Sequence, residues 1–148
     1  MTDPSDNSYA GDISVRETWD ALAGDPRAVL IDVRSAAEWS FVGVPLLVSI
    51  GKEPLMVAWN DFATGERIPD FTGRLKSALD AAGVGTDAPL YFLCRSGNRS
   101  RHAAIAATAA GYGRSYNIDI GFEGGLDANR HRATPGSWKA AGLPWVQS

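Results

Sequence analysis

The sequence of 148 residues contains one cysteine, Cys94, and two histidines, His102 and His131. A single cysteine cannot form a disulfide within the chain, and it cannot supply a thiolate zinc cluster. The two histidines are widely separated, so we expect no metal site. A lone thiol without a disulfide framework is typical of a protein from a reducing compartment.

Long apolar runs and an excess of basic residues are also missing. No apolar run approaches the ~18 residues that a membrane span needs. The first lysine or arginine is Arg16, so the basic start of a secretory signal peptide is not seen. We therefore expect a cytoplasmic protein with no membrane partner. The net charge of −3 argues against a general nucleic-acid binder.

What remains is the composition of one globular domain, with 45% hydrophobic and 21% charged residues. We expect a flexible arm over residues 1–12 and one domain over residues 13–148. Apolar runs that suit buried strands alternate with amphipathic segments, which predicts an α/β fold with a mainly parallel sheet. The expected strands are 28–31, 46–50, 89–93 and 116–120, with 55–59 ambiguous, and the expected helices are 14–23, a short one opened by residue 35, 70–82, 100–112 and a short one near 137–141.

Two helix starts are marked by capping boxes, in which a serine is followed three residues later by glutamate. The pairs are Ser14 with Glu17 and Ser35 with Glu38. They predict where the first two helices begin.

The strongest chemical signal is the segment Cys94-Arg95-Ser96-Gly97-Asn98-Arg99-Ser100, which lies between a predicted strand and a predicted helix. Ligands gather at the carboxyl ends of parallel strands, and a helix N-terminus offers unpaired N–H groups and partial positive charge. A tight turn at Gly97 can point amides at an anion. With two arginines nearby, these features favour a thiolate over a thiol. We predict a nucleophilic Cys94 in an anion-binding cradle; the alternative is a buried structural cysteine.

The length of the loop bears on the reaction. Cysteine phosphatases carry an arginine after five intervening residues, whereas here that position is Ser100 and the arginines lie at Arg99 and Arg101. The shorter loop from Cys94 to Arg99 suits one extra sulfur atom on the cysteine better than a tetrahedral phosphate. A phosphatase remains the less favoured reading.

Three segments together resemble a single-domain rhodanese, a sulfurtransferase. They are the stretch from Leu30 to Arg34 followed by Glu38-Trp39, the cysteine loop, and Gly124-Gly125 followed by residues 138–144. The resemblance implies a rhodanese-like fold, a central mainly parallel sheet with helices on both faces. The family often has Gly-His-Ile-Pro-Gly-Ala where this chain has residues 42–47 without histidine. Residues 51–69 and 126–136 are expected insertions, either of which could form a lid or a partner surface.

The resemblance also implies a two-step reaction without a cofactor. Cys94 would take a sulfur from a small anionic donor such as thiosulfate and pass it, as a persulfide, to a thiol or cyanide acceptor. No second cysteine exists to release the sulfur as a disulfide. The expected donor-binding residues are Arg95, Ser96, Gly97, Asn98 and Arg99, with Arg95 preferred over Arg99.

Ser100, Asp32 and Arg34 are expected to support the site, the last two chiefly through a structural network with Glu38. The alternative function is a non-catalytic rhodanese-like module that carries persulfide or binds a partner.

Overall fold

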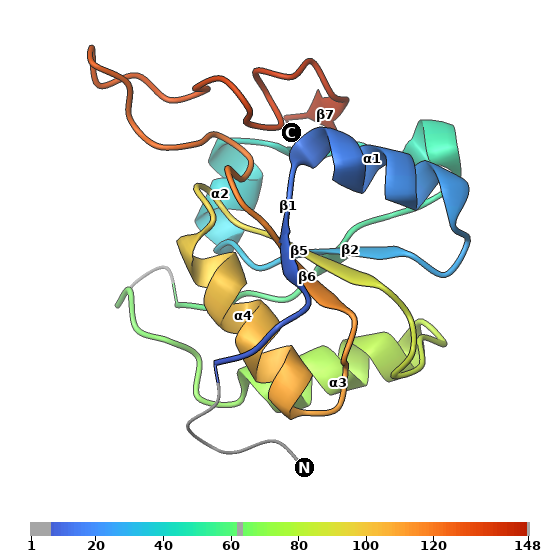
Figure 1. Ribbon diagram of the computed structural model, residues 1–148. Coiled ribbons are helices and arrows are strands. Elements are labelled where there is room, and N and C mark those ends of the chain that lie inside the picture. Colours follow the sequence, from blue (N-terminus) through green and yellow to red (C-terminus); the bar gives the residue numbers. More distant parts are fainter. Residues whose placement is uncertain (1–6, 62–63, 148) are drawn as a thin grey trace.

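The computed structural model describes residues 7–61 and 64–147 (Figure 1). Its centre is a five-stranded sheet in the order β1-β6-β5-β2-β4, in which every neighbouring pair is parallel. A two-stranded antiparallel sheet, β3 with β7, lies apart from it. The strands are β1 Gly11–Ile13, β2 Val29–Asp32, β3 Val44–Pro45, β4 Leu55–Met56, β5 Leu90–Leu93, β6 Ser115–Ile118 and β7 Trp145–Val146, and the helices are α1 Val15–Gly24, α2 Ala36–Phe41, α3 Phe71–Ala81 and α4 Asn98–Ala109, with a 3-10 turn η1 at Val48–Ile50.

Helices cover both faces of the parallel sheet, as the sequence predicts (Figure 1). Ile31 and Phe92 belong to the buried cluster that contains the apolar residues of α3 and α4. Leu30 and Leu93 belong to the opposite cluster, with the apolar residues of α1. Because alternate side chains point to opposite faces of a strand, this double burial requires the unbroken apolar run of β5.

Helix α4 lies close to the sheet because its inner face is built from small residues. Ala103, Ala104 and Ala107 are completely buried. Both predicted capping boxes are present: Ser14 with Glu17 opens α1, and Ser35 with Glu38 opens α2.

The expected strand over residues 46–50 is wrong. Leu47 is buried, but its neighbours Leu46 and Val48 are exposed, and the chain turns through η1 to Gly51 in the left-handed region, at φ 71°. A single buried side chain anchors this segment, whereas a strand buried on both faces needs several. The ambiguous segment supplies the strand instead, since Leu55–Met56 pairs with β2.

Two further differences lie near the chain ends. The first strand, Gly11–Ile13, pairs with β6, so the expected arm over residues 1–12 includes the start of the sheet; residues 1–6 of that arm lie outside the described residues. Over residues 137–141 the chain forms a bend followed by turns rather than a helix. Gly142, at φ 74°, follows immediately and ends any helical progression.

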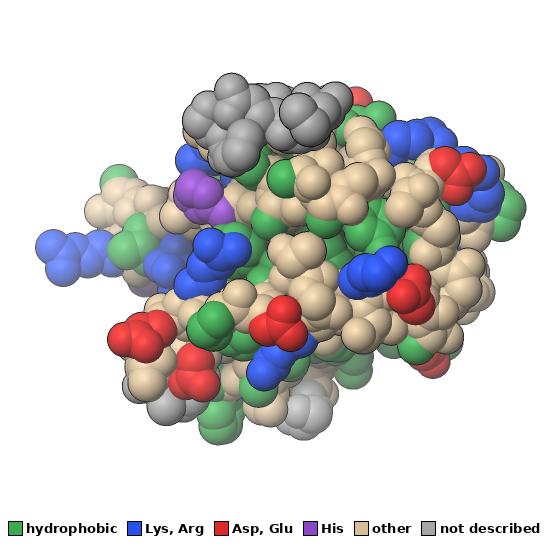
Figure 2. Space-filling view, turned by 90° about the horizontal axis from the view of Figure 1, so that it is seen from below, with side chains coloured by type: hydrophobic (Ala, Val, Ile, Leu, Met, Phe, Trp, Pro, Cys, Tyr) green, Lys and Arg blue, Asp and Glu red, His purple; other side chains and the backbone are tan. Residues whose placement is uncertain are grey.

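The exposed charges of the molecule are mixed in sign. On the face seen in Figure 2, the Lys and Arg side chains are interspersed with Asp and Glu rather than separated from them. In the ranges that the structure describes, no helix is long and apolar enough to cross a membrane.

Candidate active site

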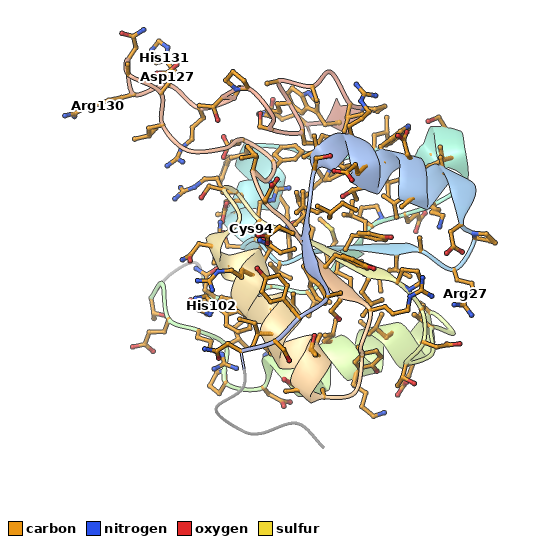
Figure 3. All side chains as sticks on the ribbon, viewed as in Figure 1. Arg27, Cys94, His102, Asp127, Arg130 and His131 are labelled. Atoms are coloured by element: carbon orange, nitrogen blue, oxygen red, sulfur yellow. The ribbon has the colours of Figure 1, made fainter. Side chains whose placement is uncertain are left out.

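Cys94 follows the last residue of β5 and lies beside the start of α4, at the carboxyl edge of the parallel sheet (Figure 3). Its side chain is almost completely buried, at 1% exposure. The Gly97 amide donates to Sγ across 3.1 Å, and Ser100 Oγ lies 3.1 Å from the same sulfur. The sulfur is therefore enclosed by the loop, with a backbone donor directed at it.

Two glycines permit this enclosure. Gly97 adopts φ +97°, and a Cβ there would overlap the carbonyl oxygen of Asp119, the residue that follows β6. Gly121 adopts φ +83°, and its Cβ would come within 2.6 Å of the carbonyl oxygens of Cys94 and Arg95. Left-handed backbone of this kind is open to glycine at little cost, so these positions fix the close packing of the loop against the following turn.

That turn also holds the loop by hydrogen bonds. Phe122 N–H donates to the Cys94 carbonyl across 2.9 Å, and the amides of Glu123 and Gly124 donate to the Arg95 carbonyl across 3.0 and 2.9 Å. The carbonyls of Cys94 and Arg95 are thus bound by the turn that follows β6. As at any helix N-terminus, the amides of the first turn of α4 have no carbonyl partner within the helix.

The two loop arginines have different surroundings. Arg99 is half-buried and forms a two-pronged ion pair with Glu38, with N···O distances of 2.7 and 2.9 Å, and donates to Asn60 Oδ1 across 3.1 Å. Arg95 is exposed. The Arg99 guanidinium is already bound to a carboxylate and to an amide oxygen. The positive charge of Arg95 is therefore the more accessible of the two to an anion from solution.

The Arg99 contact changes the titration of both partners. Burial alone would raise the pKa of Glu38, but hydrogen bonding and charge from Arg99, with hydrogen bonds from Ser35, lower it from 4.5 to about 2. Burial would lower the pKa of Arg99, but the hydrogen bond and charge of Glu38 outweigh it and raise the pKa above the usual value for arginine. The pair is therefore charged throughout the physiological range.

Asp32 and Arg34 form a second, separate ion pair, so the expected network joining them to Glu38 is wrong. Both side chains are fully buried, with Arg34 Nη2 2.7 Å from Asp32 Oδ2 and 2.8 Å from the Gly43 carbonyl. The guanidinium also lies over the Phe122 ring, 4.2 Å from its centroid. Arg34 thereby joins the end of β2 to the turn that supports the cysteine loop.

Ser100 is completely buried, and its hydroxyl connects the cysteine to β6. Ser100 Oγ donates to Asn117 Oδ1 across 2.6 Å, and Asn117 Nδ2 donates to Asp12 Oδ1 across 3.0 Å. Sequence reasoning missed Asn117, Asp12 and Asn60. The available signal was Asn117 within the strand expected over residues 116–120, because an amide buried in a strand needs partners.

The expected insertions differ from each other. Part of residues 51–69 belongs to the core, since Leu55–Met56 is a strand and Trp59 packs edge-on against Phe71, with ring centroids 4.8 Å apart; residues 62 and 63 lie outside the described residues. Residues 126–136 form a largely exposed loop whose tip carries Asp127, Arg130 and His131 and projects from the body (Figure 3).

His102 belongs to α4 and contacts a side chain of the segment between β4 and α3. His102 stacks on Trp59, with ring centroids 6.4 Å apart. Over residues 7–61 and 64–147, no group of three or more His, Cys, Asp or Glu side chains is placed to hold a metal ion.

The fold and the loop define a class: an α/β domain with its cysteine between the central strand and the helix that follows. A family model described as a rhodanese-like domain matches residues 14–128. The chain belongs to the rhodanese-like family, which confirms the resemblance seen in the sequence.

Solved structures support the same assignment. Rv0390 from M. tuberculosis is 48% identical, with a TM-score of 0.86 over 95% of this chain and 100% of that one. The polysulfide-sulfur transferase homodimer from Wolinella succinogenes shares the fold at 18% identity, with a TM-score of 0.61 over 93% of this chain and 78% of that one.

Sequence relatives extend over nearly the whole chain. An uncharacterized protein of Rickettsia rickettsii, the RP600 homolog, is 36% identical over 129 residues, which are 87% of this chain and 91% of that protein. The chloroplastic rhodanese-like domain-containing protein 4 of Arabidopsis thaliana is 27% identical over 134 residues, 90% of this chain but 25% of that longer protein.

Proposed function

We propose that the protein is a thiosulfate-type sulfurtransferase that works through a persulfide on Cys94. The observation that carries the proposal is the position of the sulfur, at the carboxyl end of β5 and 3.1 Å from the Gly97 amide. Family membership supports sulfur transfer in general, and the Wolinella neighbour that shares the fold is named for that chemistry. We place the reaction in the cytoplasm, where a single cysteine stays reduced.

The first half-reaction transfers the outer sulfur of the donor. The Cys94 thiolate attacks the sulfane sulfur of thiosulfate, a new S–S bond forms, and the S–S bond of the donor breaks. Sulfite leaves with the bonding electrons, and the negative charge of the persulfide lies on its outer sulfur. Backbone donors of the loop and of the first turn of α4 stabilise that charge, as an oxyanion hole stabilises oxygen.

The second half-reaction regenerates the enzyme. A thiolate or cyanide attacks the outer sulfur, takes it as a new persulfide or as thiocyanate, and returns the Cys94 thiolate. Because the chain has no other cysteine, the acceptor must be external. No redox cofactor is needed, because each step is a displacement at sulfur: the attacking nucleophile supplies the electron pair of the new bond, and the leaving group keeps the pair of the bond that breaks.

Donor binding is assigned to Arg95 through Arg99, with the largest part given to Arg95. Its exposed guanidinium can meet the sulfonate end of thiosulfate, and charge-assisted bonds of this kind are worth about 1.5–3 kcal/mol. Arg99 contributes less because Glu38 holds it. Since the sulfur is enclosed, we propose that the loop opens as a donor enters.

The test is thiocyanate formation from thiosulfate and cyanide. We expect turnover with ping-pong kinetics, and none with the Cys94→Ser variant. Slow turnover by a protein that nevertheless holds a stable persulfide would favour the carrier function instead. Hydrolysis of an aryl phosphate, with no thiocyanate formed, would overturn the proposal in favour of a phosphatase.

A further inference from the structure

A chain of hydrogen bonds leads from the buried sulfur to the edge of the sheet. Cys94 Sγ lies 3.1 Å from Ser100 Oγ, which donates to Asn117 Oδ1. Asn117 Nδ2 donates to Asp12 Oδ1, which also accepts from Tyr9 Oη across 2.8 Å. Asp12 and Asn117 are direct partners in the pairing of β1 with β6, so the two backbones hold the polar groups in register.

The chemistry of these groups gives the chain one direction. An ionised carboxylate can only accept hydrogen bonds, so Asp12 requires the NH₂ end of the Asn117 amide. The oxygen end then faces Ser100 and takes the single hydrogen of its hydroxyl. Consequently the Ser100 oxygen presents a lone pair to Cys94. The 3.1 Å contact between Sγ and Oγ is then a hydrogen bond when the sulfur carries its own hydrogen and donates it.

Loss of the thiol proton changes the sulfur from a hydrogen-bond donor into an acceptor. A thiolate requires donors, and Ser100 can supply one only by turning its hydrogen away from Asn117. Asn117 is 3% exposed and Ser100 is completely buried, so an amide oxygen deprived of its donor would not be satisfied by bulk water. Leaving a buried acceptor unpaired is costly.

We propose that Asp12 and Asn117 are positioning residues that hold the Ser100 hydroxyl hydrogen away from Cys94 and thereby restrain its ionisation. The Gly97 amide acts in the opposite sense, because it donates to the sulfur in either state. The functional meaning of this restraint rests on the proposed function, in which the thiolate is the nucleophile. The restraint keeps the lone thiol less reactive until a donor enters the loop.

The experiment is alkylation of the full chain by iodoacetamide at pH 7. Cys94 is the only cysteine, so the total rate reports on that residue alone. We expect Asp12→Asn to raise the rate roughly threefold to tenfold, because an amide at position 12 lets the Asn117 side chain reverse and frees the Ser100 hydrogen for the sulfur. Asp12→Ala, which removes the acceptor altogether, is a second variant with the same expected direction.

Asp20→Asn is the matched control, since it removes the same charge from an exposed position on α1. We expect it to leave the alkylation rate unchanged. Arg99, whose charge interacts with Cys94, keeps its Glu38 partner in all of these variants. A faster reaction confined to the Asp12 variants therefore cannot come from the general loss of negative charge.

A double variant distinguishes an effect on the position of the Ser100 hydrogen from a general loosening of the structure around Cys94. In a Ser100→Ala background no hydroxyl links the amide to the sulfur, so Asp12→Asn should no longer raise the rate. An unchanged or slower reaction of Asp12→Asn in the otherwise native chain, or an equal acceleration in both backgrounds, would overturn the proposal. Alkylation needs no sulfur donor, so its outcome is independent of whether thiosulfate leaves a persulfide on Cys94.

Discussion

Replacing Glu38 with glutamine isolates the ion pair that holds the active-site helix to α2. Glutamine at this position still closes a capping box, so the variant loses chiefly the charge that faces Arg99. The fall in the pKa of Glu38 from 4.5 to about 2 corresponds to roughly 3 kcal/mol, because each tenfold change in proton affinity is worth ~1.4 kcal/mol. We expect Glu38→Gln to lower the free energy of unfolding at pH 7 by about that amount.

The pH dependence has a definite sign. The pKa of Glu38 is lower in the folded chain than in the unfolded one, so its stabilisation is complete above 4.5 and is lost as the pH falls toward about 2. Urea unfolding of the native and Glu38→Gln proteins at pH 7, 4 and 3 should show a difference in unfolding free energy that shrinks with acidification.

Glu17→Gln is the matched control, because Glu17 occupies the same position in the capping box of α1 and forms no ion pair among the described residues. Its effect at pH 7 should stay within ~0.5 kcal/mol, as is usual for exposed positions. A Glu38→Gln effect no larger than this, or one that does not change between pH 7 and pH 3, would show that the charge of Glu38 does not stabilise the fold through Arg99.

Three further changes test the loop and its support. Arg95→Ala should raise the thiosulfate KM by about tenfold or more, because a charge-assisted bond is worth ~1.5–3 kcal/mol. The control Arg27→Ala, beside the amino end of β2, should leave the KM unchanged. Equal KM values for the two variants would show that Arg95 does not bind the donor. Gly97→Ala should abolish persulfide formation and lower the melting temperature, because its Cβ meets the Asp119 carbonyl, whereas Gly113→Ala, with open space around it, should do neither. Arg34→Met should cost about 3–5 kcal/mol in urea unfolding, since it leaves a buried carboxylate unpaired; a loss below 1 kcal/mol would contradict the buried pair.

Local sequence signals predicted much of this fold because the interactions that set it are local. The capping boxes at Ser14 and Ser35 link residues three apart, and the run before Cys94 is apolar because both faces of β5 are covered. The strand Gly11–Ile13 was missed because a three-residue segment carries no periodic pattern. Its place in the sheet depends on pairing with β6, more than 100 residues away in the sequence.

The active site likewise combines local features, which the sequence predicts, with long-range contacts, which it does not. The cysteine loop is one continuous segment, so its position at a strand end could be inferred from the sequence. The partners of its side chains could not, because Arg99 meets Glu38 from α2 and Ser100 meets Asn117 from β6 only after the sheet has formed. Local spacing gave no means of choosing between Glu38 and another acid for Arg99.

The central claim is that Cys94 accepts and holds a sulfur atom. The most direct measurement is intact-protein and peptide mass spectrometry after incubation with thiosulfate, followed by treatment with a reducing thiol. We expect a gain of one sulfur on the peptide that contains Cys94, which the thiol removes and which the Cys94→Ser variant does not show. An unchanged mass in the native protein, or an equal gain in the variant, would contradict it.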